Sequence, residues 1–266
     1  MHLDNLPKEL STFKKIIQAS QRECLQIYAT DEPAKITDSK FGGHPFLPIG
    51  TKYPKDYKEM PMIFLLQINF AQLPKNQIFP EKGLLQFYVA DDDYFGMNFE
   101  DPIKQRGFKI LYFENPETKY ETNFTFLDEV EWECPPFSGS EPFEKRLQFK
   151  KDIDYVPMYS VEFDNFFNKN AQLFRQAGDE AKVLSESYWK AIDTMLNSHK
   201  LGGYARFVQD DPRHRFPNFQ HYISLLQIDS QGPFMWGDGG RAHFMIDEKD
   251  LKNKDFSKVF YKWSCF

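Results

Sequence analysis

The sequence predicts an α+β fold, with a duplicated, mainly antiparallel β core, an N-terminal helix and a central helical segment. Nine short runs rich in aromatic and β-branched residues, each bounded by turn residues, predict the strands. Several runs alternate between apolar and polar side chains, as in 147–149, which is typical of an antiparallel sheet with one wet face. The 266 residues are 41% hydrophobic and 27% charged, a composition that allows one globular domain with a sizeable core.

The first expected element is an amphipathic helix over residues 8–28, because apolar side chains recur there near helical spacing as far as Tyr28. Pro33 follows and restricts the residue before it, which predicts the end of this helix. A loop rich in glycine and proline then leads into the first series of strands. These strands are expected at 63–70, 84–90, 108–113, 120–127, 146–150 and 155–163.

Two helical segments are expected in the middle of the chain. Residues 164–177 are rich in aromatic side chains, and residues 179–200 carry apolar side chains three or four apart, from Ala181 to His199. Gly202 lies just past the expected end of the second helix, where glycine commonly terminates helices. His199 on this stripe is interpreted as a core histidine. Further strands are expected at 222–229, 242–246 and 259–265.

Two stretches of the chain resemble each other. Gly42-Gly43 matches Gly202-Gly203, and Leu65-Leu66-Gln67-Ile68 matches Leu225-Leu226-Gln227-Ile228, both at an offset of 160. We therefore expect a single domain over 1–266 with two internal repeats, about 38–93 and 198–250, joined by strands and helices at 104–197. A lone two-stranded unit is marginal in water, so the two copies should pack together around a pseudo-twofold axis.

Charge and composition exclude several classes of protein. The chain has 33 basic and 39 acidic residues, and the segment 91–133 alone holds 12 acidic and 4 basic ones. This balance argues against nucleic acid, which needs a basic footprint, and leaves the segment either a solvated face or a docking face for a basic partner. The longest apolar run, 62–66, is too short to cross a membrane. Three cysteines without a paired spacing and no visible secretory signal predict reduced thiols in a cytoplasmic protein.

Familiar catalytic, nucleotide-binding and metal-binding motifs are absent from the sequence, so we expect no cofactor and no metal and assign no catalytic residue. Two glutamines interrupt apolar strands and either brace the Gly-Gly loops or face a cleft between the copies. Polar residues near the second repeat form either a tight turn or one wall of a groove. The residues of this candidate groove are Gln67, Gln227, Gln209, Asp210, Asp211, Trp236, Asp238 and Arg241.

Several motifs of the chain are recognisable as a set. They are the strings Asp38-Ser39-Lys40-Phe41-Gly42-Gly43-His44-Pro45-Phe46-Leu47-Pro48, Leu66-Gln67-Ile68-Asn69-Phe70, Asp91-Asp92-Asp93-Tyr94-Phe95-Gly96, His199-Lys200-Leu201-Gly202-Gly203-Tyr204 and Trp236-Gly237-Asp238. Together these strings resemble the motifs of the YwqG-like family of bacterial proteins, and the resemblance covers nearly the whole chain, in order. One departure is Ala205, where the family usually has proline. The resemblance implies an α+β fold with a duplicated core and a cytoplasmic bacterial setting, but no chemistry, because the function of this family is unknown.

The leading hypothesis is a non-catalytic binding or interaction protein whose partner is another protein, in an immunity-like or regulator-like role. One alternative is a hydrolase or metal-assisted enzyme with an acidic site in the second repeat. That enzyme would use Asp210, Asp211, Asp238 and His199, of which at least two must lie within hydrogen-bond reach in one cleft. A second alternative is a protein that binds a small ligand without turnover.

Overall fold

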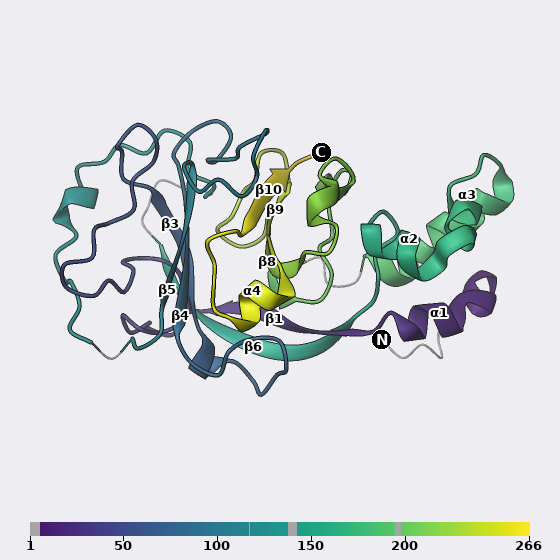
Figure 1. Cartoon of the computed structure of the whole chain (residues 1–266), viewed down its shortest axis with the longest axis horizontal. Helices are drawn as coiled ribbons and strands as arrows, with labels where there is room; N and C mark the ends of the chain where they lie inside the picture. Colours follow the sequence, from purple (N-terminus) through teal and green to yellow (C-terminus); the bar gives the residue numbers. More distant parts are fainter. Residues whose placement is uncertain (1–5, 117, 138–142, 195–197) are drawn as a thin grey trace.

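A ten-stranded antiparallel sheet dominates the computed structural model, which describes residues 6–116, 118–137, 143–194 and 198–266 (Figure 1). Within these residues the strand order is β10-β9-β8-β7-β1-β6-β2-β3-β4-β5. The strands are β1 (Arg22–Thr30), β2 (Lys40–Gly42), β3 (Ile63–Asn69), β4 (Leu84–Val89), β5 (Phe108–Phe113), β6 (Glu144–Asp154), β7 (Lys200–Gly202), β8 (Ile223–Asp229), β9 (Arg241–Ile246) and β10 (Phe260–Ser264). A mainly antiparallel sheet with a few helices agrees with the predicted class.

The strand order is symmetric about the central pair β1–β6. Strands β2 to β5 lie on one side of this pair and β7 to β10 lie on the other, and each group of four pairs in chain order. The registers also correspond, since Lys40 pairs with Gln67 in one group and Lys200 pairs with Gln227 in the other. The register shifts between Phe64 and Leu66 in β3, and the same irregularity lies between Ser224 and Leu226 in β8. The two groups are called the first and second halves of the sheet below.

The two halves face each other across the main core. In Figure 1, β3 to β5 stand opposite β8 to β10, with the long strands β1 and β6 running beneath them. The rings of Phe87 in β4 and Phe244 in β9 meet edge to face with 4.9 Å between centroids. Phe108 and Tyr261 lie 5.1 Å apart in the same core. Burial of such rings, with about 0.5–1.5 kcal/mol more from each aromatic pair, holds the halves together.

A helical arm projects from one end of the sheet, on the right of Figure 1. It has a core of its own, built mainly from stacked and edge-to-face rings such as Phe163, Phe167, Phe174 and Tyr188. Its elements are η2 (Lys8–Phe13), α1 (Lys14–Ala19), α2 (Val161–Phe167), η5 (Asn168–Phe174), α3 (Asp179–Tyr188) and the π-helical turn η6 (Trp189–Asp193). The remaining helical elements are η3 (Phe70–Gln72), η4 (Thr125–Leu127), η7 (Pro212–His214), η8 (Pro217–Phe219) and α4 (Glu248–Lys252).

The prediction of one helix over residues 8–28 is wrong. Helical structure ends at Ala19, and the chain then enters β1, where Cys24 and Ile27 are buried in the middle of the sheet. Apolar residues three apart suit a helix as well as a buried strand, so their spacing did not decide between the two. Pairing with β6 along its whole length and with β7 over three residues makes β1 a central strand.

Three other expected elements also differ. The segment 120–127 contains the turn η4 and no strand, and 155–163 leads into α2. Ser160 starts that helix, because its Oγ accepts a hydrogen bond from the N–H of Phe163 at 3.2 Å. The helix expected at 179–200 ends at Asp193, with 195–197 outside the described residues, and Lys200 begins β7. His199 therefore lies beside a strand and not on a helix.

Candidate functional site

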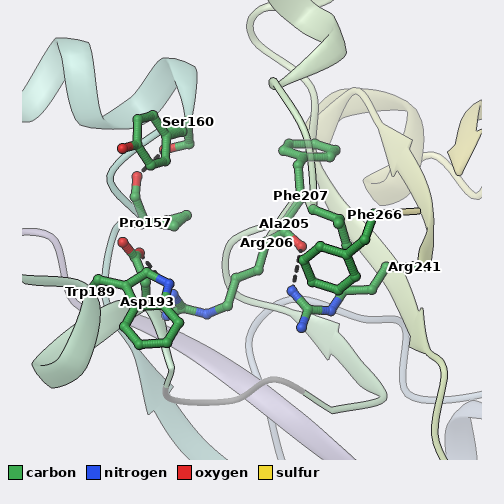
Figure 2. A pocket seen from close by; sticks show the side chains of 11 residues that line it. Pro157, Ser160, Trp189, Asp193, Ala205, Arg206, Phe207, Arg241 and Phe266 are labelled. Carbon is green, nitrogen blue, oxygen red and sulfur yellow. Dashed lines mark hydrogen bonds and ion pairs between the residues drawn. The ribbon is translucent and has the colours of Figure 1, made fainter. Parts of the chain in front are cut away.

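A pocket of about 210 Å³ lies where the helical arm meets the second half of the sheet (Figure 2). We call it the arm pocket. One wall comes from the arm and the segment that leads into it, and the other comes from the loop after β7, the start of β9 and the last residue. The lining residues are Pro157, Tyr159, Ser160, Trp189, Asp193, Ala205, Arg206, Phe207, Val208, Arg241 and Phe266.

Buried ion pairs link the two walls. Asp154, at the end of β6, is fully buried and accepts hydrogen bonds from Lys200 Nζ at 2.7 Å and from Arg206 Nη2. Arg206 Nη1 also lies 3.4 Å from Asp193 Oδ1 at the end of η6. Burial by itself would raise the pKa of Asp154, but the charges of Lys200 and Arg206 outweigh it and hold this pKa below its usual value. Two cations and two carboxylates thus form a balanced cluster.

Two groups at the pocket have unused hydrogen-bonding capacity. Asp193 Oδ1 accepts a hydrogen bond from the N–H of Met158 at 3.1 Å, whereas buried Asp193 Oδ2 has no partner among the described residues. The Nε of Arg206, a residue only 3% exposed, also has no partner there. Burial raises the pKa of Asp193 to about 6, and the nearby charge of Arg206 offsets this only in part. Both unpaired atoms are shielded from solvent, so they lie behind the surface of the arm pocket and not in its open space.

Arg241 occupies the opposite wall at the start of β9. Its Nε donates to Asp229 Oδ1 at 2.9 Å, and its Nη1 donates to the carbonyl oxygen of Arg206 at 3.0 Å (Figure 2). Arg241 pairs with Asp229 in the sheet, as Leu84 pairs with Asn69 in the first half. Leu84, which is fully buried, is therefore the residue matched to Arg241.

The two predicted glutamines fill matched positions and brace loops. Gln67 Oε1 accepts a hydrogen bond from the N–H of Phe46, and Gln227 Oε1 accepts one from the N–H of Arg206, each at 3.0 Å. Their amide nitrogens donate to the carbonyl oxygens of Asp38 and of Ser198, respectively. Neither glutamine lines the arm pocket, and Phe46, fully buried in the first half, is the residue matched to Arg206.

The other residues of the candidate groove do not meet in one place. Trp236 is fully buried in the main core and packs edge to face against Phe95 at 5.3 Å, so it does not form the wall of a groove. Asp211 is buried and bound to Arg213, and its Oδ2 accepts a hydrogen bond from the N–H of Val161 at 3.0 Å. The exposed members are Gln209, Asp210 and Asp238. Arg241 is the member of the predicted set that lines the arm pocket.

His199 is a core residue with its own partners. Its Nδ1 accepts a hydrogen bond from the N–H of Asp229 at 3.1 Å, and its Nε2 lies 3.2 Å from the carbonyl oxygen of Gln231. Its ring meets Phe41 edge to face at 5.0 Å. Burial lowers the pKa of His199 to about 4, so the ring is neutral near pH 7. The enzyme alternative named His199, Asp210, Asp211 and Asp238. His199 and Asp211 form their hydrogen bonds with residues outside this set.

Sequence reasoning missed the residues at the centre of the pocket, which are Asp193, Arg206 and Trp189. Trp189 and Asp193 lie in η6 and Arg206 lies in the loop after β7, and the approach of these two segments depends on the packing of the arm on the sheet. A signal for one of them was available, because the repeat at an offset of 160 aligns Arg206 with Phe46. A charged residue aligned with an apolar one inside a repeat indicates a local difference in role.

Within the described residues, no group of three or more His, Cys, Asp or Glu side chains could hold a metal ion. No helix of this part of the chain is long and apolar enough to cross a membrane.

The fold and the pocket define an α+β protein with a large antiparallel sheet and a polar pocket beside a helical arm. A family model described as a domain of unknown function (DUF1963) matches residues 39–265, and the chain belongs to this family. No curated protein matches the chain.

Proposed function

We propose that this protein is a non-catalytic binding protein and that the arm pocket binds a small ligand. The observation that carries this proposal is the pair Arg206 and Arg241, which stand where the first half has buried Phe46 and Leu84. Burying charged groups costs several kcal/mol per ion before pairing offsets it, so apolar residues would be the simpler way to close this part of the sheet. The two arginines in the second half of the sheet, without charged counterparts in the first half, therefore support a role in binding.

The composition of the pocket fits a small organic ligand. Tyr159 and Trp189 are each about half exposed at the pocket, and Phe207 adds a third ring. Aromatic walls with a few converging polar groups are typical of small-molecule sites. The volume of about 210 Å³ is below the roughly 300–1,000 Å³ of pockets for drug-sized ligands, so the ligand should be smaller than those.

The chemistry of the lining residues favours binding over turnover. The hydroxyl of Ser160 donates to the carbonyl oxygen of Pro157 at 2.9 Å and accepts from the N–H of Phe163, so both of its roles are taken by the helix start. No histidine or cysteine lines this pocket among the described residues. A nucleophile with an adjacent base, which hydrolysis would need, is therefore not offered by the described lining residues.

We further propose that the chain arose by internal duplication and that it is a YwqG-like protein of the bacterial cytoplasm. Matched strand order, register, register shifts and glutamine contacts in the two halves support the duplication. The motif strings given above support the YwqG-like assignment.

A thermal-shift screen of small metabolites tests the binding proposal. A ligand at 100 times its Kd stabilises the folded state by about 2.7 kcal/mol, or about 5–10 °C for a protein of this size. The matched variant is Arg241→Leu, which places the residue of the first half in the pocket. We expect hits that stabilise the wild type and not this variant, with no product detected by mass spectrometry. Equal stabilisation of both proteins, absence of hits, or conversion of a hit would contradict the proposal.

A further inference from the structure

We infer that the arm pocket takes an aromatic side chain presented by an extended peptide of a partner protein, which adds a short strand beside residues 207–209; this inference rests on the proposed function. Residues 47–49 of the first half match residues 207–209, because each segment follows the residue whose N–H is bound by a matched glutamine. The first half therefore shows how a segment in this position is covered.

In the first half, residues 119–121 cover the matched segment as a short antiparallel strand. Pro48 and Tyr120 form its central pair. On one side of this pair the N–H of Ile49 donates to the carbonyl oxygen of Lys119 at 3.1 Å, and on the other side the N–H of residue 121 donates to the carbonyl oxygen of residue 47 at 2.8 Å. The ring of Tyr120 lies 5.9 Å from that of Phe46, so the central side chain of the covering strand points towards the residue that Arg206 replaces in the second half.

In the second half the matched main-chain groups are available for pairing. Phe207 and Val208 are half-buried, and Gln209 is exposed. Within the part of the chain that the structure describes, no hydrogen bond engages the carbonyl oxygen of Phe207 or the N–H of Gln209. These are the acceptor and the donor that the covering strand uses in the first half. Such an open pair of main-chain groups is what an added strand binds, while a pocket for its side chain supplies specificity.

The central side chain of an added strand would enter the arm pocket. Arg206 and Val208, which match Phe46 and Pro48, both line this pocket. In Figure 2, Phe207 stands on one side of the pocket and Trp189 on the other. Rings on both walls favour a flat aromatic side chain, the type that Tyr120 provides in the first half. The volume of about 210 Å³ suits one side chain better than a larger ligand.

A peptide with the sequence of residues 118–122, Thr-Lys-Tyr-Glu-Thr with blocked ends, is the probe, because it reproduces the covering strand of the first half. We would titrate it against the full chain by ligand-observed NMR. We expect it to bind, and we expect replacement of its tyrosine by alanine to weaken binding by about tenfold or more, since the ring is lost from the pocket.

Two N-methylated forms of this peptide test the strand pairing. N-methylation of the glutamate removes the N–H that should donate to the carbonyl oxygen of Phe207, so binding should weaken by about tenfold. The N–H of the tyrosine points away from the edge, because the two residues of such a central pair exchange no hydrogen bonds. N-methylation of the tyrosine is therefore the matched control and should leave the affinity unchanged.

Variants of the protein test the same pairing from the other side. Gln209→Pro removes the N–H that should donate to the peptide, so binding should weaken by about tenfold. Val208→Pro introduces the proline that the first half has at position 48 and should bind like the wild type. Gln209→Ala removes the side-chain hydrogen bond to the carbonyl oxygen of Cys265 but keeps the N–H, so it too should bind normally. Thermal melts would show that each variant is folded.

The inference is overturned if the peptide does not bind, if the alanine form binds as tightly, if the two N-methylated forms bind alike, or if Gln209→Pro binds like Val208→Pro. These results differ from a failure of the proposed function. If the thermal-shift screen gives hits that depend on Arg241 while the peptide does not bind, the pocket takes free small molecules and this inference alone falls. If neither the metabolites nor the peptide bind, both proposals fall.

Discussion

Replacing Asp154 with asparagine should destabilise the protein strongly while barely changing the shape of the residue. Asp154 is fully buried, and besides Lys200 and Arg206 it accepts the backbone N–H groups of Tyr204 and Tyr155, each at 2.9 Å. The amide would leave two buried cations with one remaining carboxylate, that of Asp193. Removing one partner of a buried ion pair typically costs about 3–5 kcal/mol. At about 2–4 °C per kcal/mol, the melting temperature should fall by about 6–20 °C.

Urea unfolding at pH 7, followed by tryptophan fluorescence, would measure this loss. The control is Asp31→Asn, which removes a partner of Lys145 at 2.6 Å from a side chain that is 94% exposed. Exposed pairs contribute little to stability, so this control should unfold like the wild type. The double variant D154N/K200M should recover part of the loss, because one of the uncompensated cations is then gone. A loss below about 1 kcal/mol for Asp154→Asn would refute the reasoning that the cluster depends on this carboxylate.

The loss of stability caused by Asp154→Asn should depend on pH in a definite direction. The pKa of Asp154 in the folded protein lies below its ordinary value of 3.8, so its contribution is fully present above that pH. It is lost as the pH falls through the folded-state pKa. The difference in stability between wild type and Asp154→Asn should therefore narrow as the pH falls below about 4.

Three further predictions concern single positions and can be measured by chemical unfolding. In Gly96→Ala the new Cβ would lie 1.7 Å from the carbonyl oxygen of Gly107, at a φ of +72°. The comparison is Gly50→Ala, where φ is +84°, no atom lies within 4 Å of the new Cβ, and the free energy of unfolding should fall by roughly 1–2 kcal/mol. We expect a clearly larger loss of stability for Gly96→Ala. Similar losses for the two alanines would contradict this. Gln67→Leu and Gln227→Leu should each cost about 2–4 kcal/mol, because each leaves buried N–H and C=O groups unpaired. The loss should be larger for Gln67→Leu, since Gln67 Oε1 also accepts from the amide of Gln86; a neutral result for either would argue against the bracing role. Burial raises the pKa of Asp193 to about 6, so the wild type should lose about 2 kcal/mol relative to Asp193→Asn as the pH rises from 4 to 7, and parallel pH profiles would show that this carboxyl is not perturbed.

The sequence was sufficient for most strands, because long runs of aromatic and β-branched residues have few other uses in a small protein. The run 108–113 coincides with β5, and 242–246 lies within β9. The sequence was not sufficient to predict β1, β2 and β7. Strands β2 and β7 have three residues each, too few for any periodicity, and β1 is defined by its partners on both sides. Tertiary pairing decides such segments, and local spacing does not.

The candidate site was harder to predict for the same reason. Arg241 was named because it follows a glycine-rich turn, and it does line the arm pocket. Trp236, from the same turn, was also named but is fully buried in the core. An aromatic residue beside glycines is equally consistent with a core position. Asp193 and Arg206 carried no local signal, because their significance lies in a contact between the arm and the sheet. The comparison of the two halves is the one feature of the sequence that could have singled out Arg206.

The position of the arm explains why the pocket lies in one half of a nearly symmetric sheet. Strand β1 pairs along its whole length with residues 146–154 of β6, and the two ends of this ribbon have different surroundings. At one end, Arg146 and Glu32 form an ion pair with side chains 37% and 57% exposed, where solvent screens their charges. At the other end, Asp154 is covered, because the chain leaves β6 there and continues into the arm. Charges that would be ordinary surface groups thus become a buried cluster, and burial raises the energetic cost of leaving any of them without a partner.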